Sequence, residues 1–364
     1  MKVRDIVSSI EEMAPLNYQE SYDNAGLIVG SYDSEIKGVL ICLDVVESVV
    51  EEAIQKGVDL IIAHHPIVFK GLKRFNGNNY VERTVILAIQ NKISIYAAHT
   101  NLDSVKGGVN DRICDLIGLQ NKRILSPVSN DLYKLITFVP TDYAEKVRNA
   151  LFEAGAGSIG DYDSCSYSLD GSGSFRGGAE TNAFVGEKGK LHFEPEVRIE
   201  TICPKHLKSK VCASLLKNHP YEEPVFDVYQ LEKENNQVGL GMIGELNEPE
   251  EALVFLKRIK KIFGVACIKH TDISKKKIKT VAVCGGSGSS LLPKAISQKA
   301  DVFVSGDFKY HEFFDAEGRI IIADIGHYES EQFTRDIFYE IVTKKFPNFA
   351  VHISEINSNP INYL

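Results

Sequence analysis

Three clusters of histidine and carboxylate side chains follow apolar runs of the sequence. The runs cover 59–64, 93–98 and 319–324, and the clusters are His64-His65, His99 with Asp103, and His327 with Glu331. Each run predicts a buried strand, and open α/β sheets bind ligands beyond the carboxyl ends of their strands. We therefore expect the three clusters to meet in one cleft. Imidazole nitrogen and carboxylate oxygen suit Zn, Fe, Mn or Co.

Each cluster also has a plain structural explanation. His64 and His65 can be two surface histidines on a loop, and Asp103 can cap a helix or hold a turn, as Asp often does. His327 and Glu331 lie four residues apart, so they can form an exposed pair on one helix face. The metal hypothesis therefore depends on the convergence of all three clusters.

Together the clusters offer three histidines and two carboxylates, enough for two divalent metals when carboxylates bridge, with His99 in addition. Two metals roughly 3.5–4 Å apart are the arrangement of many hydrolases, in which the metals activate water and polarise the scissile group. His99 can be a ligand, a partner of a ligand or a general base. We interpret it as a candidate acid/base, because it lies at the strand end, four residues before Asp103.

The same segments resemble the signature motifs of the GTP cyclohydrolase 1 type 2 homologue family, dinuclear-metal proteins also described as NGG-interacting-factor-like. The resemblance covers about 1–127 and 235–364 and rests on four motifs: 64–69 (His-His-Pro-Ile-Val-Phe), 99–103 (His-Thr-Asn-Leu-Asp), 326–331 (Gly-His-Tyr-Glu-Ser-Glu) and 22–27 (Tyr-Asp-Asn-Ala-Gly-Leu). Tyr22 stands where the family usually has Trp. The resemblance implies that the metal ligands are His64, His65, Asp103, His327 and Glu331.

The resemblance also implies an assembly and an inserted domain. The family forms toroidal hexamers, so we expect a homohexamer. Its longer members carry a central insert similar to the CutA-like and P-II-like signalling fold, and residues 219–224 (His-Pro-Tyr-Glu-Glu-Pro) match the end of such inserts. A GTP cyclohydrolase activity does not follow from these motifs.

The order of predicted elements indicates an α/β protein with an α+β insert. Apolar strands near 39–44, 59–64 and 93–98 alternate with helices, and the same rhythm returns with strands near 279–284, 301–306 and 319–324. This predicts a host of two α/β lobes with mostly parallel sheets, over 1–127 and 235–364. Between the two parts of the host, residues 128–234 have the predicted β-α-β-β-α-β order of a ferredoxin-like domain. One hairpin strand of this domain is expected around 173–186.

A glycine- and serine-rich turn follows the strand 279–284. Gly286, Ser287 and Gly288 lie in this turn, directly before a predicted helix. Backbone N–H groups are free at a helix N-terminus, so these residues are a candidate anion-binding loop; the alternative is a plain tight turn.

The composition of the chain limits the kinds of partner and the cellular location that we expect. The net charge of −8 argues against nucleic-acid binding through one large basic face and leaves room only for a local basic patch. No apolar run approaches the roughly 20 residues of a membrane helix, and no secretory signal is visible. Seven cysteines without a C-x-x-C pair read as reduced thiols, so we expect a cytoplasmic protein.

Two functions compete at this point. The first is a dinuclear-metal hydrolase acting on a small phosphorylated or nucleotide-like substrate. The second is a ring-shaped binding or scaffold protein, regulatory or associated with nucleic acid, whose metals are structural. Five protein ligands for two metals leave coordination positions open, which favours catalysis.

Overall fold

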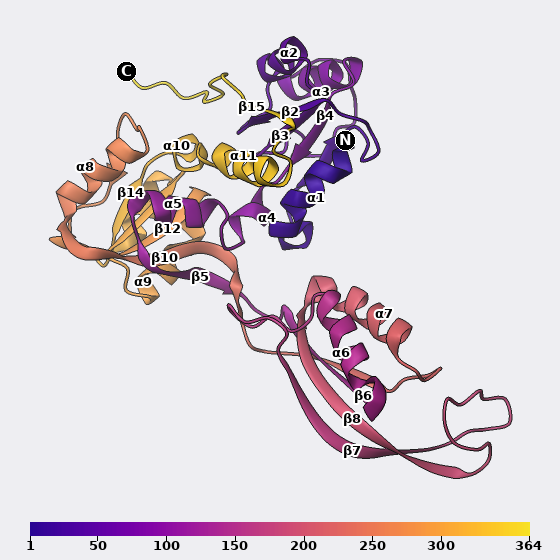
Figure 1. Cartoon of the computed structure of the whole chain (residues 1–364). Coiled ribbons are helices and arrows are strands. Elements are labelled where there is room, and N and C mark those ends of the chain that lie inside the picture. Colours follow the sequence, from indigo (N-terminus) through magenta and orange to yellow (C-terminus); the bar gives the residue numbers. More distant parts are fainter. The chain divides into compact units, whose positions relative to one another are not determined.

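The computed structural model describes residues 1–364, which form two compact units (Figure 1). The host unit is Met1–Ser126 with Gln237–Leu364, and the insert is Pro127–Asn236. The sequence predicted an insert over 128–234. Every helix of the chain falls short of the length and apolar character that crossing a membrane would require.

The first sheet of the host unit has the order β1-β4-β3-β2-β15. Its strands are β1 (Gly26–Val29), β2 (Gly38–Cys42), β3 (Leu60–Ala63), β4 (Ser94–Ala97) and β15 (Ala350–Ile353). All neighbours are parallel except β1, which runs antiparallel to β4. The last strand of the chain thus completes the sheet that the first hundred residues begin.

Helices cover both faces of this sheet. Val39 and Ile41 of β2 belong to one hydrophobic core, and Leu40 and Cys42 to another, which is why the strand reads as a continuous apolar run. The helices of this part of the chain are α1 (Val3–Met13), α2 (Glu47–Lys56), α3 (Tyr80–Gln90), α4 (Thr100–Asp103) and α5 (Val109–Ile117), with a 3-10 turn at Leu16–Tyr18.

The second sheet has the order β11-β14-β13-β12-β10-β5. Its strands are β5 (Gln120–Val128), β10 (Asn235–Glu251), β11 (Lys269–His270), β12 (Lys277–Ser287), β13 (Val302–Gly306) and β14 (Ile321–Asp324). Only β12, β13 and β14 are parallel to one another, whereas β10 and β11 run antiparallel to their neighbours β12 and β14. The prediction of a mostly parallel sheet is therefore wrong for this lobe.

The two sheets of the host unit share one core. Val281 and Val304 of the second sheet lie in the same hydrophobic cluster as Val39 and Ile62 of the first. The helices here are α8 (Ala252–Ile262), α9 (Leu292–Ser297), α10 (His327–Glu331) and α11 (Thr334–Lys345), with 3-10 turns at Ser289–Leu291 and Tyr310–Ala316. The sequence after the strand near 319–324 also predicts a single helix over 327–345, but the structure has two helices there, and the first of them, α10, carries the third ligand cluster.

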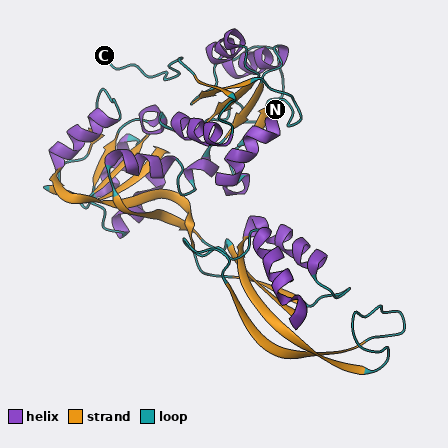
Figure 2. Ribbon diagram, in the orientation of Figure 1, coloured by secondary structure: helices purple, strands orange, loops and turns teal.

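The insert has the predicted β-α-β-β-α-β order. Its elements are β6 (Leu132–Pro140), α6 (Ala144–Glu153), β7 (Ser166–Arg176), β8 (Leu191–Pro204), α7 (Lys208–Asn218) and β9 (Phe226–Gln230), with 3-10 turns at Thr141–Tyr143 and Lys205–Leu207. The sheet order is β7-β8-β6-β9, all antiparallel. Both helices pack on one face of this sheet (Figure 2). The hairpin strand expected around 173–186 is β7, which starts earlier, at Ser166. The prediction missed its start because most of β7 is exposed and shows no apolar alternation.

Candidate metal centre

The ends of three strands place the predicted ligands. His64 and His65 directly follow β3, His99 comes two residues after β4, and Asp103 ends the short helix α4. The remaining cluster starts α10, which follows β14 of the second sheet. The two sheets pack on one core, so these strand ends meet and the three clusters lie together.

His64 and Asp103 face each other through two buried atoms that make no hydrogen bond. The carbonyl of Ala98 accepts from Nδ1 of His64 at 2.9 Å, which leaves Nε2 as a lone-pair donor to a metal. That Nε2 lies 3.6 Å from Oδ1 of Asp103 and 3.6 Å from Oε1 of Glu331. Neither His64 Nε2 nor Asp103 Oδ1 has a hydrogen-bond partner. Leaving buried polar atoms unpaired costs about 1–3 kcal/mol each, and a cation between them would remove that cost.

His65, His327 and Glu331 form the second group of close ligand atoms. Oε2 of Glu331 lies 3.0 Å from Nε2 of His65 and 3.1 Å from Nε2 of His327. The two Nε2 atoms are 3.2 Å apart, so all three atoms face one point. The chemistry of this set, two imidazoles and a carboxylate, suits a divalent transition metal.

Glu331 joins the two groups. Its Oε1 faces His64 and its Oε2 faces His65 and His327. The sets His64-Asp103-Glu331 and His65-His327-Glu331 each gather their ligand atoms within 4.8 Å. A carboxylate with one oxygen in each set can bridge two metals, so the residues fit the expected pair of ions.

Two further carboxylates, which sequence analysis did not assign, orient these histidines. Oδ1 of Asp44 lies 2.7 Å from Nδ1 of His65, and Oδ2 of Asp307 lies 2.7 Å from Nδ1 of His327. Such a partner fixes the ring and directs Nε2 to the metal. The signal was available in the sequence, because Asp44 follows the end of β2 and Asp307 the end of β13, the same position as the predicted ligands.

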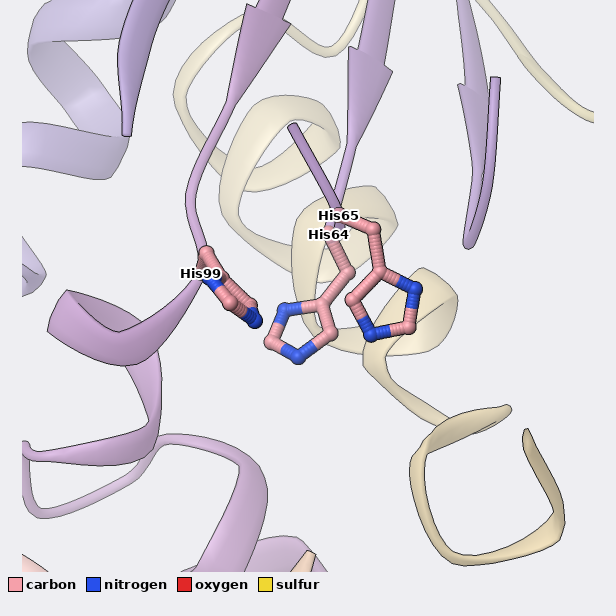
Figure 3. Close-up of side chains that lie close together, drawn as sticks. All are labelled: His64, His65 and His99. Carbon is pink, nitrogen blue, oxygen red and sulfur yellow. The ribbon is translucent and has the colours of Figure 1, made fainter. Parts of the chain in front are cut away.

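His99 stands at the edge of the centre. Figure 3 shows its ring turned toward those of His64 and His65, and the ring centroids are 5.2 Å and 5.4 Å apart. Its Nδ1 lies 2.7 Å from Oδ1 of Asp23. Asp23 is itself held through its second oxygen by the backbone N–H and the hydroxyl of Thr100. His99 therefore has the anchored Nδ1 and free Nε2 of a general base, although its ligand atom also lies within 4.8 Å of those of His64 and His65.

Burial and neighbouring charges both shift the pKa values of the site. Burial disfavours charge on His65 and His327, but the carboxylates of Asp44, Asp307 and Glu331 outweigh it. They raise the pKa of His65 to about 9 and that of His327 to about 11. Burial, with repulsion from Glu331, raises the pKa of Asp103 to about 8.

The carboxylates that face the histidines are shifted the other way. Burial favours the neutral form of Asp23, but hydrogen bonds from His99 and Thr100 lower its pKa to about 2. Burial likewise opposes charge on Glu331, yet the surrounding histidines hold its pKa well below the ordinary value. Glu331 and Asp23 are therefore anions, as a bridging ligand and an orienting partner must be.

The predicted anion loop has a different arrangement. The N–H of Gly286 donates to Oγ of Ser330 at 2.9 Å, so this amide already has a partner within the protein. Gly286 has φ +60°, and a Cβ there would collide with Oε1 of Glu331. A Cβ on Gly288 would collide with Cys284 and Ser305. The turn gives Glu331 room beside the backbone, and anion binding by Ser287 and Gly288 stays a prediction.

Comparison with known proteins gives the same family over the whole chain. The family model described as Duf34/NIF3 (NGG1p interacting factor 3) matches residues 1–360. A Halalkalibacterium halodurans protein named GTP cyclohydrolase 1 type 2 homolog is 38% identical over 365 residues, covering 99% of this chain and 98% of that protein. A Bacillus subtilis protein of the same name is 38% identical over 370 residues, with the same coverage.

Solved structures agree with these sequence matches. A Bacillus cereus protein related to NIF3 is 38% identical and superposes with a TM-score of 0.86, covering 100% of this chain and 99% of that one. A Staphylococcus aureus protein is 32% identical with a TM-score of 0.79 and the same coverage.

Proposed function

The chain belongs to the Duf34/NIF3 family, and we propose that it is a metal-dependent hydrolase built on two divalent metals, acting on a small phosphorylated or nucleotide-like substrate. One observation carries the proposal: the two carboxylate oxygens of Glu331 face two separate sets of ligand atoms. The proposed ligands are His64, His65, Asp103, His327 and Glu331. When bound, such a metal pair acts as a Lewis acid and lowers the pKa of water.

In this proposal, three aspartates orient the histidines of the centre, and His99 transfers the proton. Asp44 and Asp307 hold the imidazoles of His65 and His327, so that their Nε2 atoms point into the centre. Asp23 keeps the proton of His99 on Nδ1, so that Nε2 is free to take a proton from water or return one to a leaving group. An imidazole held in this way is suited to general acid/base catalysis.

One side of the centre is open to a substrate. The side chain of His64 is fully buried, whereas those of His327 and His65 are 33% and 22% exposed. Protein thus closes the His64 side, and the substrate would approach across the two exposed imidazoles. This open side favours a catalytic centre over a structural one, which would be enclosed by protein ligands.

A reaction screen with a matched variant tests the proposal. We expect metal-loaded protein to hydrolyse at least one substrate in a panel of phosphomonoesters, phosphodiesters and nucleotides, and metal-stripped protein to hydrolyse none. His99→Ala should keep its metals and lose roughly 10²–10⁴-fold in rate. Loss of metal in this variant would make His99 a ligand. Metal-loaded protein that is inactive across the panel would favour the scaffold function instead.

The assembly, the insert and the location are also proposals. We propose a homohexamer working in the cytoplasm, as the resemblance and composition predict, and the mass of the protein in solution tests the assembly. We further propose that the insert is a ferredoxin-like domain of the CutA-like and P-II-like kind. A cavity of about 630 Å³ in the insert is lined by Phe138, Phe175 and Tyr221 among others, which suits a small regulatory ligand.

A further inference from the structure

Two aromatic side chains stand exposed next to the metal centre. Tyr22 is 63% exposed and Phe69 is 46% exposed, and their ring centroids lie 6.3 Å apart. The ring of Phe69 in turn lies 6.2 Å from the ring of His99, edge to face. The rings of Tyr22, Phe69 and His99 therefore form a row that leads from the surface to the edge of the centre.

Hydrogen bonds hold the segment that carries Tyr22 on both sides. Before Tyr22, the N–H of Glu20 donates to Oγ1 of Thr100 at 2.9 Å. After it, Asp23 is bound to His99, and Nδ2 of Asn24 donates to the carbonyl of Val68 at 2.6 Å. The last bond joins the Tyr22 segment to the residue before Phe69. These bonds hold the two segments side by side next to His99, with the ring planes of Tyr22 and Phe69 tilted by 49° to each other.

A fixed pair of exposed rings is not explained by packing. Large aromatic side chains gain free energy when they are buried, and here the fold presents two of them to solvent beside a polar site. Flat exposed rings are the side chains on which planar heteroaromatic rings stack. A ligand that stacked there would place its attached groups over His99 and the metals.

We propose that Tyr22 and Phe69 form a stacking platform for the base of a nucleotide substrate, whose phosphate-bearing part then lies over the metal centre. The inference rests on the proposed function and names its substrate class. Stacking uses the π-face that every base has, so the platform selects nucleotides over ring-free phosphates and discriminates weakly between bases.

The absence of tryptophan from the chain makes a sharp test available. Tyr22→Trp installs a single tryptophan in the platform. Zinc-loaded Tyr22→Trp protein should show a saturable change in tryptophan emission with GMP and with AMP, and none with ribose 5-phosphate, which lacks the ring. Adding Phe69→Ala should weaken nucleotide binding by at least about fivefold, the lower end expected for loss of one stacking partner.

Controls separate this inference from the proposed function. Tyr339→Trp, on α11 and 40% exposed, carries a single tryptophan outside the platform and should not respond to nucleotide. Metal content is measured on every variant, so loss of the metals, which would undermine the proposed function, is seen separately from loss of stacking. If Tyr22→Trp disturbs the segment, calorimetry of Phe69→Ala against the unmodified chain gives the same comparison.

Two results would overturn the platform while the metal centre stood. One is an equal response to ribose 5-phosphate and to the nucleotides in protein that holds its metals. The other is a tryptophan emission of the Tyr22→Trp protein that indicates a buried ring and does not change with any ligand. That result would mean that another copy of the chain covers the rings.

Discussion

Each histidine of the proposed centre is fixed through the ring nitrogen that faces away from the other ligand atoms. Nδ1 of His64 meets a backbone carbonyl, while the Nδ1 atoms of His65 and His327 meet Asp44 and Asp307. The sequence predicted the inward-facing residues because their types and spacing are those of ligands. It did not assign the orienting aspartates, because a single Asp after a strand is common in turns. Their position after strand ends is visible in the sequence, and the structure adds their pairing with Nδ1 of His65 and of His327.

The protonation of the histidines predicts how metal binding depends on pH. In the metal-free protein the pKa values of His65 and His327, about 9 and about 11, lie above the ordinary value of 6.5. Both rings therefore carry a second proton near neutral pH, and a metal must displace it. Zinc affinity should rise between about pH 6 and about pH 8, with release of about three protons per chain near neutral pH, because the carboxyl of Asp103, with a pKa of about 8, must also lose its proton.

Calorimetry in buffers of different ionisation enthalpy counts those protons.

The stability of the metal-free protein should fall as the pH rises, which is the opposite of the change in zinc affinity. A raised folded pKa adds stability below about pH 6.5 that fades as the pH rises through about 9. A zinc affinity that is flat over this range would contradict the assigned hydrogen bonds of His65 and His327.

At the scale of elements, the strands that carry ligands were the easiest to predict. β2, β3, β4, β13 and β14 are buried throughout and read as continuous apolar runs. β10 was missed, since its buried and exposed residues are mixed and it contains glycines such as Gly241. The sequence prediction also missed the amphipathic helices α1 and α8, because it relied on continuous apolar runs, which indicate buried strands and do not reveal a helical periodicity. None of these missed elements carries a proposed ligand.

The turn after β12 offers a test of how an element positions a ligand. Gly286→Ala should expel the Glu331 carboxylate from its place, because the added Cβ would occupy the position of Oε1. We expect severe loss of metal with a folded protein. Gly264→Ala is the matched control, since Gly264 has a similar φ of +66° and nothing within 4 Å of its Cβ position.

Both glycine variants carry similar backbone strain, about 1–2 kcal/mol, so Gly264→Ala shows the fall in melting temperature that is due to strain alone, and the collision with Glu331 adds to it in Gly286→Ala. Elemental analysis then isolates the effect on the site. A Gly286→Ala protein with its full complement of metal would show that the turn does not hold Glu331 in place.

At the scale of the whole molecule, the chain forms two units whose boundaries composition only partly reveals. The insert begins at the end of β5 and ends at the start of β10, which are neighbours in the second sheet. The sharing of one core by the two host sheets, and the return of β15 to the first sheet, involve contacts across most of the chain length. Periodicity is a local signal and cannot report such pairings.

Deletion of the insert tests whether the host unit alone makes the site. All proposed ligands lie in Met1–Ser126 and Gln237–Leu364. Joining Ser126 to Gln237 with a short glycine-serine linker is feasible, because neighbouring strands lie about 4.8 Å apart. We expect the shortened protein to bind the same amount of metal. Loss of metal from a deletion protein whose circular dichroism and melting remain cooperative would mean that the insert contributes to the centre.

The proposed two-metal centre depends on Glu331 as its bridge, and elemental analysis of purified, metal-replenished protein is the most direct test. We expect about two transition metals per chain in the unmodified protein. Glu331→Ala should lose both, because it removes the shared ligand. Glu329→Ala should keep both, since Glu329 is also buried but contacts Asn359 and belongs to neither ligand set. Unmodified protein that holds no metal, or a Glu331→Ala protein that holds as much as the Glu329→Ala control, would contradict the bridged centre.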